Sequence, residues 1–148
     1  MNFHPHRPAW LRRFIGWIPA VSLMVAIFII SGRDAPEFMR HKLFDFQDKA
    51  AHALAYYVLA VSFMRALLWH TGASIHRKIL FLAVVLSALY GLTDEWHQSF
   101  IPSRTASIDD WLADAAGALL LLFSHSWIAR LLEWERNLWR FAASFRSP

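Results

Sequence analysis

The sequence predicts an all-α integral membrane bundle with four transmembrane helices, and two observations predict it. Of the 148 residues, 57% are hydrophobic and only 18% are charged, with eight Trp and twelve Phe. Few soluble domains of this size could bury so much apolar surface. The apolar residues also gather in four runs, each close to the length that a helix needs to cross the hydrocarbon.

We expect a single domain over 1–148, in which the spans are residues 12–31, 49–69, 77–97 and 110–129. Each crossing needs about 20 helical residues. The third and fourth apolar runs are shorter than this, so their spans must take in charged residues such as Asp94 and Asp114. Charged groups at that depth are costly, and they are usually functional.

The basic residues indicate how the chain is oriented. Nine Lys and Arg lie in the first 13 residues, at Arg77 and Lys78 and after residue 129, against five in the other two connections, up to Lys49 and at Arg104. This bias predicts a protein of the cell inner (cytoplasmic) membrane with both termini in the cytoplasm. Arg65, near the cytoplasmic end of span two, is expected to reach the headgroups as an anchor. Because the basic residues are scattered, we expect no nucleic-acid partner.

The tail, 130–148, alternates apolar and charged residues at helical spacing, with Trp127, Leu131, Trp134 and Leu138 on one side. It is either an amphipathic cytoplasmic helix on the inner leaflet or a continuation of span four into water.

Polar side chains recur at helical spacing near the outward ends of spans two, three and four. The pairs are Asp48 with His52, Asp94 with His97, Glu95 with Gln98, and Asp110 with Asp114. Residues three or four apart share one face of a helix. The predicted topology brings these three ends to the same side of the membrane, so the sequence predicts one outward-facing polar pocket.

The connection before span four adds two expectations. Ser107 followed by Asp110 fits a capping box at the start of that helix. Arg104 is the only basic residue in the connection, and its planar guanidinium suits either a carboxylate partner or a phosphate-bearing ligand.

Two stretches, "DKAAHALAYY" and "YGLTDEWHQSFIPSRTASIDDWLADAAG", resemble the VanZ-like family of small multi-span membrane proteins. The matching positions are Asp48, Lys49, His52, Glu95, Gln98, Phe100, Pro102, Arg104, Asp110, Asp114 and Gly117. Many members carry an amide where this chain has Asp114. The founding member is linked to low-level teicoplanin resistance, so the resemblance implies an envelope protein with a role of that kind.

We therefore expect a protein that binds a glycopeptide, lipid or cell-wall-precursor-like molecule among the membrane lipids. Glu95, His97 and His52 would supply hydrogen bonding or proton transfer. The ligand would be held by Arg104, at its anionic group, and by a wider set: Gln98, Asp48, Lys49, Asp94, Asp110 and Asp114.

Several alternatives stay open at this point. The cluster could perform acid–base or metal-assisted chemistry on a lipid-linked substrate. It could also be a structural network in which Arg104 and Lys49 neutralise the acids. We predict no cofactor, with a divalent metal as an alternative, and the absence of Cys excludes thiolate zinc sites. A transporter is disfavoured because few polar groups continue along the spans.

Overall fold

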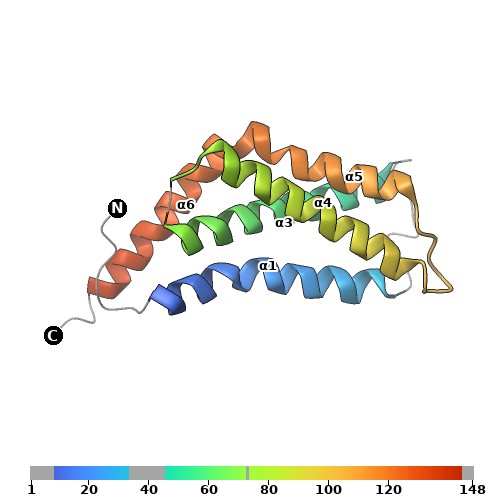
Figure 1. The fold of residues 1–148 in the computed structure, drawn as a ribbon, viewed down its shortest axis with the longest axis horizontal. Coiled ribbons are helices and arrows are strands. Elements are labelled where there is room, and N and C mark those ends of the chain that lie inside the picture. Colours follow the sequence, from blue (N-terminus) through green and yellow to red (C-terminus); the bar gives the residue numbers. More distant parts are fainter. Residues whose placement is uncertain (1–8, 34–45, 73, 145–148) are drawn as a thin grey trace.

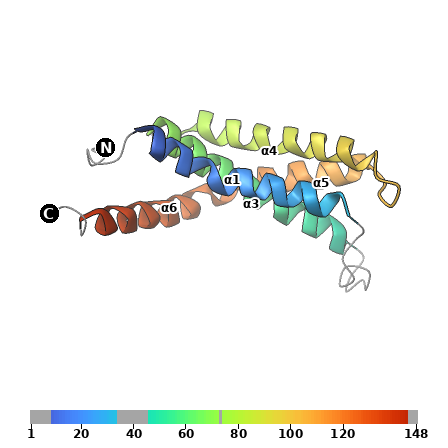
Figure 2. The same cartoon turned by 90° about the horizontal axis from the view of Figure 1, so that it is seen from below.

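The computed structural model describes residues 9–33, 46–72 and 74–144, and its regular elements within these ranges are all α-helices. They are α1 (Ala9–Ser31), α3 (Gln47–Thr71), α4 (Arg77–Gln98), α5 (Ile108–Leu119) and α6 (Leu121–Ser144). They form an elongated bundle in which α6 continues from α5 (Figure 1). The start of α1 and the end of α6 lie at one end, and the α4–α5 connection lies at the other, as Figure 2 also shows. The predicted all-α membrane bundle is confirmed.

Three helices are long and apolar enough to cross a membrane: Arg13–Ser31, Gln47–Thr71 and Arg77–Gln98. The helices α5 and α6 meet the same criterion only as a pair, bent by 47°. The bend lies at Leu120, inside the run predicted as one span, and α6 passes residue 129 without a break. The protein is therefore a multi-pass membrane protein, with three spans or with four if the bent pair crosses.

The core is built around α3, which contributes fully buried Tyr56, Leu59 and Met64. Large apolar side chains elsewhere point outward, among them Phe14 on α1 and Phe81 on α4. Exposed apolar surface of this extent marks a face that meets another apolar phase. In a membrane that phase is the lipid, which explains why the outside of the bundle is as apolar as its inside.

A glycine brings α5 close to α3. A Cβ atom at Gly117 would overlap the backbone of Ala53, including its carbonyl oxygen. Small residues at such positions let membrane helices pack at short range, where van der Waals contact replaces the missing hydrophobic driving force. Gly117 therefore sets the distance between the two helices that carry His52 and Asp114.

Arg65 does not behave as the predicted membrane anchor, and that expectation is wrong. Its Nε donates to Glu135 Oε2 at 3.0 Å, and its Nη1 donates to the carbonyls of Gly16, at 3.0 Å, and Ile15, at 3.3 Å. Pro19 lacks the N–H that would otherwise bond the Ile15 carbonyl in α1. The guanidinium satisfies this freed oxygen, and so ties α1, α3 and α6 together.

The predicted apolar side of the carboxyl-terminal helix is present and uncovered. Its four members, Trp127, Leu131, Trp134 and Leu138, are all exposed in α6. Glu135 contacts Arg65 of α3 and Ile128 of α6 is buried in the core, so the four exposed residues form a separate apolar face of α6.

Replacing Gly117 with Ala should destabilise the bundle. The added methyl group has no room against Ala53, and overpacking of this kind costs about 2 kcal/mol. We expect a lower midpoint of thermal unfolding in detergent. Ala116→Leu is the matched control, because Ala116 is exposed on the same helix. Equal stability of the Gly117→Ala protein would contradict the close packing.

Candidate functional site

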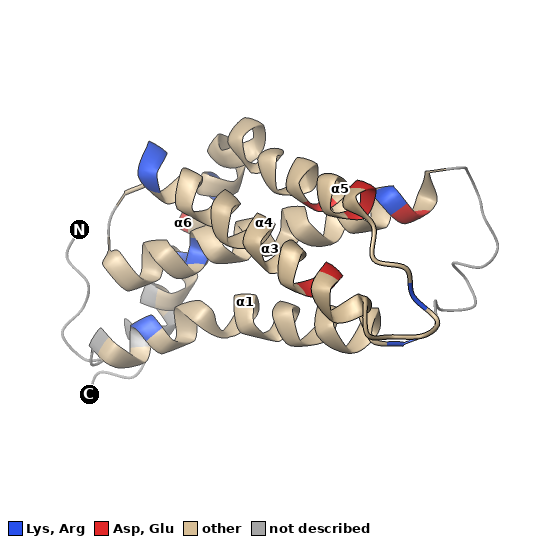
Figure 3. Cartoon of the chain, turned by 45° about the vertical axis from the view of Figure 1, so that its right-hand side comes forward, with Lys and Arg blue, Asp and Glu red and all other residues tan. Residues whose placement is uncertain are grey.

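Most of the described acidic residues lie at the end of the bundle that holds the α4–α5 connection (Figure 3). Three of them are buried: Asp94 is 3% exposed, Glu95 6% and Asp114 0%. Burying a carboxylate is expensive unless other groups satisfy it. Each of these side chains must therefore be explained by its partners.

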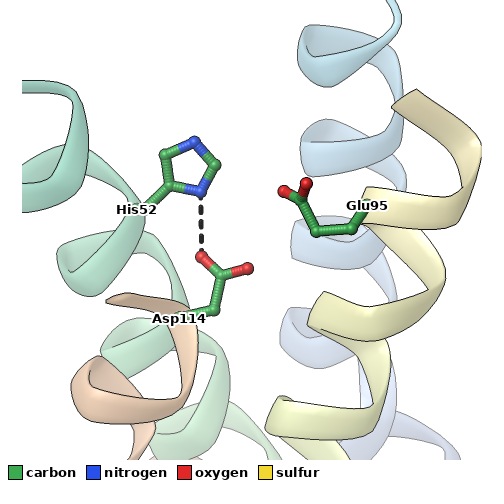
Figure 4. A group of neighbouring side chains, drawn as sticks. All are labelled: His52, Glu95 and Asp114. Atoms are coloured by element: carbon green, nitrogen blue, oxygen red, sulfur yellow. Dashed lines mark hydrogen bonds and ion pairs between the residues drawn. The ribbon is translucent and has the colours of Figure 1, made fainter. Parts of the chain in front are cut away.

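His52, Glu95 and Asp114 form the first group, which we call the His–Glu–Asp cluster (Figure 4). The residues come from α3, α4 and α5 respectively. His52 Nδ1 lies 2.9 Å from Asp114 Oδ1, and one donor atom from each side chain lies within 4.8 Å of the others. The polar stripes that the sequence predicted on three separate helices thus meet at one point.

The Glu95 carboxylate is held by two hydrogen bonds outside the cluster. Its Oε2 accepts the Ser107 backbone N–H at 2.7 Å, and its Oε1 accepts from Gln98 Nε2 at 3.2 Å. Gln98 Nε2 also donates to Asp94 Oδ2 at 3.1 Å, and the Ser31 hydroxyl donates to Asp94 Oδ1 at 2.6 Å. Gln98 therefore links the two neighbouring carboxylates of α4, and Ser31 connects them to α1.

The start of α5 is capped differently from the sequence prediction. Ser107 does act as the cap, since its hydroxyl accepts the Asp109 N–H at 3.2 Å. The partner expected for its own N–H was Asp110, and this is wrong. Glu95 of α4 takes that N–H, while Asp110 forms an ion pair with Lys49. The cap consequently joins α5 to α4, and the ion pair joins α5 to α3.

Arg104 contacts backbone carbonyls in the described part of the chain. Its Nε donates to the Arg33 carbonyl at 2.8 Å, and its Nη2 donates to the Ile30 carbonyl at 3.3 Å. Basic side chains commonly satisfy carbonyls that a helix leaves unbonded at its carboxyl end. Arg104 thus closes the end of α1, and its role toward a ligand stays a prediction. Asp48 is exposed and is not a member of the cluster.

His97 lies on the side of α4 that faces α1. Its ring stacks on Phe28 with centroids 4.0 Å apart and planes at 21°. Its Nδ1 is buried and has no hydrogen-bond partner among the residues that the structure describes. The structure thus separates His97 from His52, although the sequence grouped both with Glu95.

A pocket of about 330 Å³ adjoins His97, between α1 and the end of α4. Its lining is mainly aromatic and consists of Phe28, Tyr90, Thr93, Asp94, Trp96, His97 and Phe100. Asp94 belongs both to this aromatic pocket and to the hydrogen-bond network with Gln98. The pocket is therefore an apolar space that borders the acidic end of the bundle.

Sequence reasoning missed Gly91, Ser31 and Phe28. A Cβ atom at Gly91 would lie 2.9 Å from Asp114 Oδ2, so this glycine makes room for the carboxylate. One signal was available for it: a glycine inside a helix costs about 1 kcal/mol relative to alanine, and Gly91 lies one turn before Glu95. Nothing comparable marked Ser31 or Phe28, whose partners lie far along the chain.

Fold and site together define a small multi-pass membrane protein whose buried polar side chains gather at one end of its helices. The chain belongs to the VanZ/LLP1 family, whose profile matches residues 11–131. The match contains every predicted site residue and confirms the resemblance found in the sequence. Comparison with curated proteins and with solved structures finds no match.

Asp114→Asn should leave the bundle as stable as before or make it more stable. Asn keeps the shape of the side chain and removes a fully buried charge, while His52 can become neutral and leave no unpaired ion. Removing one partner of a buried ion pair is strongly destabilising when it leaves an uncompensated charge, and a neutral His52 leaves none. The measurement is thermal unfolding in metal-free detergent buffer, with exposed Asp109→Asn as the control. A clear loss of stability would mean that the charge itself holds the helices together.

Proposed function

We propose that this VanZ-like envelope protein binds an amphiphilic lipid or cell-wall-precursor-like molecule at the acidic end of its bundle. The observation that carries the proposal is the aromatic pocket between α1 and α4, which shares Asp94 with the buried hydrogen-bond network. An amphiphile needs an apolar space close to polar groups, and this pocket is an apolar space whose wall includes Asp94.

The apolar part of the ligand would enter from the lipid. Two aromatic residues of the pocket, Trp96 and Phe100, are 69% and 66% exposed on the outside of the bundle. The two rings contact each other edge to face, with their centroids 5.4 Å apart, and so form a wall at the rim of the pocket. Ligand sites are typically apolar cavities with few polar groups, and about 330 Å³ falls at the lower end of their usual volumes.

The polar part of the ligand would donate hydrogen bonds. The groups near the pocket are mainly acceptors, namely the carboxylates of Asp94 and Glu95, and the buried Nδ1 of His97 has no partner among the described residues. Two nitrogens of Arg104 are occupied by carbonyls of α1. We therefore favour a head group rich in hydroxyl or amino groups, such as a sugar, over the anionic group expected from the sequence.

Catalysis on the same head group is the second candidate function. It is favoured by the convergence of His52, Glu95 and Asp114 from three helices at the same end of the bundle as the pocket. A chemically altered lipid after incubation with the purified protein would distinguish it from binding alone. A purely structural role predicts neither result. Teicoplanin resistance stays a prediction from the family, since a glycopeptide is one of several sugar-bearing molecules that fit this chemistry.

We also propose that both termini lie in the cytoplasm of a cell whose inner membrane holds the protein. The beginning of α1 and the end of α6 lie at the same end of the bundle, opposite the α4–α5 connection (Figure 1). The Lys and Arg bias of the sequence favours the cytoplasm for that end. The polar site would then face outward.

Thr93→Phe should block the aromatic pocket. Thr93 lines the pocket and is exposed, so a phenyl ring there would fill the space without disturbing the core. In nanodiscs that contain a glycolipid with a diazirine in its acyl chain, we expect photolabelling of the Trp96 segment to fall about tenfold, which corresponds to ~1.4 kcal/mol of binding.

Leu92→Phe is the matched control, because Leu92 is an exposed neighbour on α4 that does not line the pocket. Unlabelled glycolipid should compete better than unlabelled phosphatidylglycerol. Equal labelling of the two variants would rule out the pocket as the binding place. Better competition by the phospholipid would overturn the preference for a sugar head group.

Reporter fusions test the orientation. A reporter that is active only outside the cytoplasm should be active when fused after Pro102 and inactive at Pro148, because four crossings return the chain to its starting side. Activity at both positions would indicate three crossings, with the pair of α5 and α6 remaining on the outer side. A cytoplasmic readout after Pro102 would invert the proposed topology.

A further inference from the structure

We propose that His52, Glu95 and Asp114 bind one divalent transition-metal ion that accepts nitrogen and oxygen ligands together, such as Zn²⁺ or Mn²⁺. The three side chains offer one imidazole nitrogen and two carboxylates, a mixed set suited to this class of ion. The inference goes beyond the binding of an amphiphile and stands without it, because none of the three side chains lines the aromatic pocket.

The spacing of the donor atoms fits one ion. Imidazole nitrogen and carboxylate oxygen bind zinc at about 2.0–2.2 Å, so two ligands of one ion can be at most ~4.4 Å apart. The donor atoms of the cluster all lie within 4.8 Å of one another. Small rotations of the side chains would therefore close the site. Figure 4 shows the three groups turned toward a common point from their separate helices.

The charges at this end of the bundle favour a cation. Three carboxylates are buried, yet the described side chains that bond Asp94 and Glu95 are the neutral Ser31 and Gln98. Of the basic residues that the sequence offered, Lys49 pairs with Asp110 and Arg104 bonds carbonyls. Among the described side chains, His52 is the one that hydrogen-bonds to Asp114. A divalent ion would supply the positive charge that buried carboxylates require.

Asp114 provides a second and independent observation. Its side chain is fully buried, and its Oδ2 has no hydrogen-bond partner within the described ranges. This oxygen lies in the space left by the missing side chain of Gly91, on the face of α4 that also carries Glu95 one turn later. A buried oxygen without a partner is rare in folded proteins and calls for an explanation. Coordination of a metal ion would explain this oxygen, and it would also explain why His52 lies beside it.

The surroundings of the cluster resemble the outer support of a metal site. Glu95 is oriented by the Ser107 N–H and by Gln98, and bonds of this kind fix the direction of a ligand. Three protein ligands leave at least one coordination position for water or for an oxygen of a bound molecule.

Metal titration of the purified full-length chain tests the proposal. After metal depletion in detergent, the wild-type protein should bind about one equivalent of Zn²⁺ or Mn²⁺ by calorimetry and by elemental analysis. Even changes to residues that only orient a ligand typically weaken metal binding by about 10–100-fold. We therefore expect Glu95→Gln and Asp114→Asn each to bind at least ~10-fold more weakly.

Asp109→Asn is the matched control, because it removes an exposed carboxylate of the same helix end outside the cluster. Its affinity should equal that of the wild type. Failure of the wild type to bind either ion, or an equal loss in Asp109→Asn, would overturn the proposal. Thermal unfolding shows whether each variant folds. If Asp114→Asn does not fold, Glu95→Gln alone is compared with the wild type. The photolabelling comparison of Thr93→Phe with Leu92→Phe does not depend on metal binding, so the metal proposal and the amphiphile proposal can fail separately.

Discussion

The structure depends on the burial of carboxylates inside a bundle whose outer surface is apolar. Lipid cannot hydrate a charged group, so each buried acid must find its partners on another helix. Asp94 finds Ser31 of α1, Glu95 finds the first turn of α5, and Asp114 finds His52 of α3. These contacts connect α1, α3, α4 and α5 at one end, which makes the polar network also the element that aligns these helices.

Close approach of the helices makes that network possible. Asp114 is a short side chain, and it reaches His52 only because Gly117 lets α5 pack against the backbone of α3. Gly91 then leaves space for its second oxygen on the side of α4. Both glycines lower the helix propensity of their helices but allow close contact. The geometry of the site and the packing of the helices therefore have the same cause. A change in the packing of α5 would therefore move the cluster as well.

The sequence predicts the helices and the residues that share a helix face, because these depend on periodicity. It does not predict the hydrogen-bond partner of a long side chain that can reach several acceptors. Hydropathy located α1, α3 and α4, and helical spacing placed His52, Glu95 and Asp114 on faces that meet. It could not show that Arg65 and Arg104 would bond carbonyls, because a guanidinium reaches many acceptors within one helix turn. The bend at Leu120 was equally hidden, since that apolar run contains no proline there.

The two ends of the bundle solve the same problem in different ways. At one end, the charge of Arg65 meets Glu135 and the carbonyls of α1, so opposite charges and open acceptors satisfy each other inside the protein. At the other end, the three buried acids meet hydroxyl, amide and imidazole groups, and Asp114 keeps an oxygen without a partner in the described chain. Stability alone would favour the first arrangement at both ends. The acidic end is therefore the part of the molecule whose composition folding does not explain.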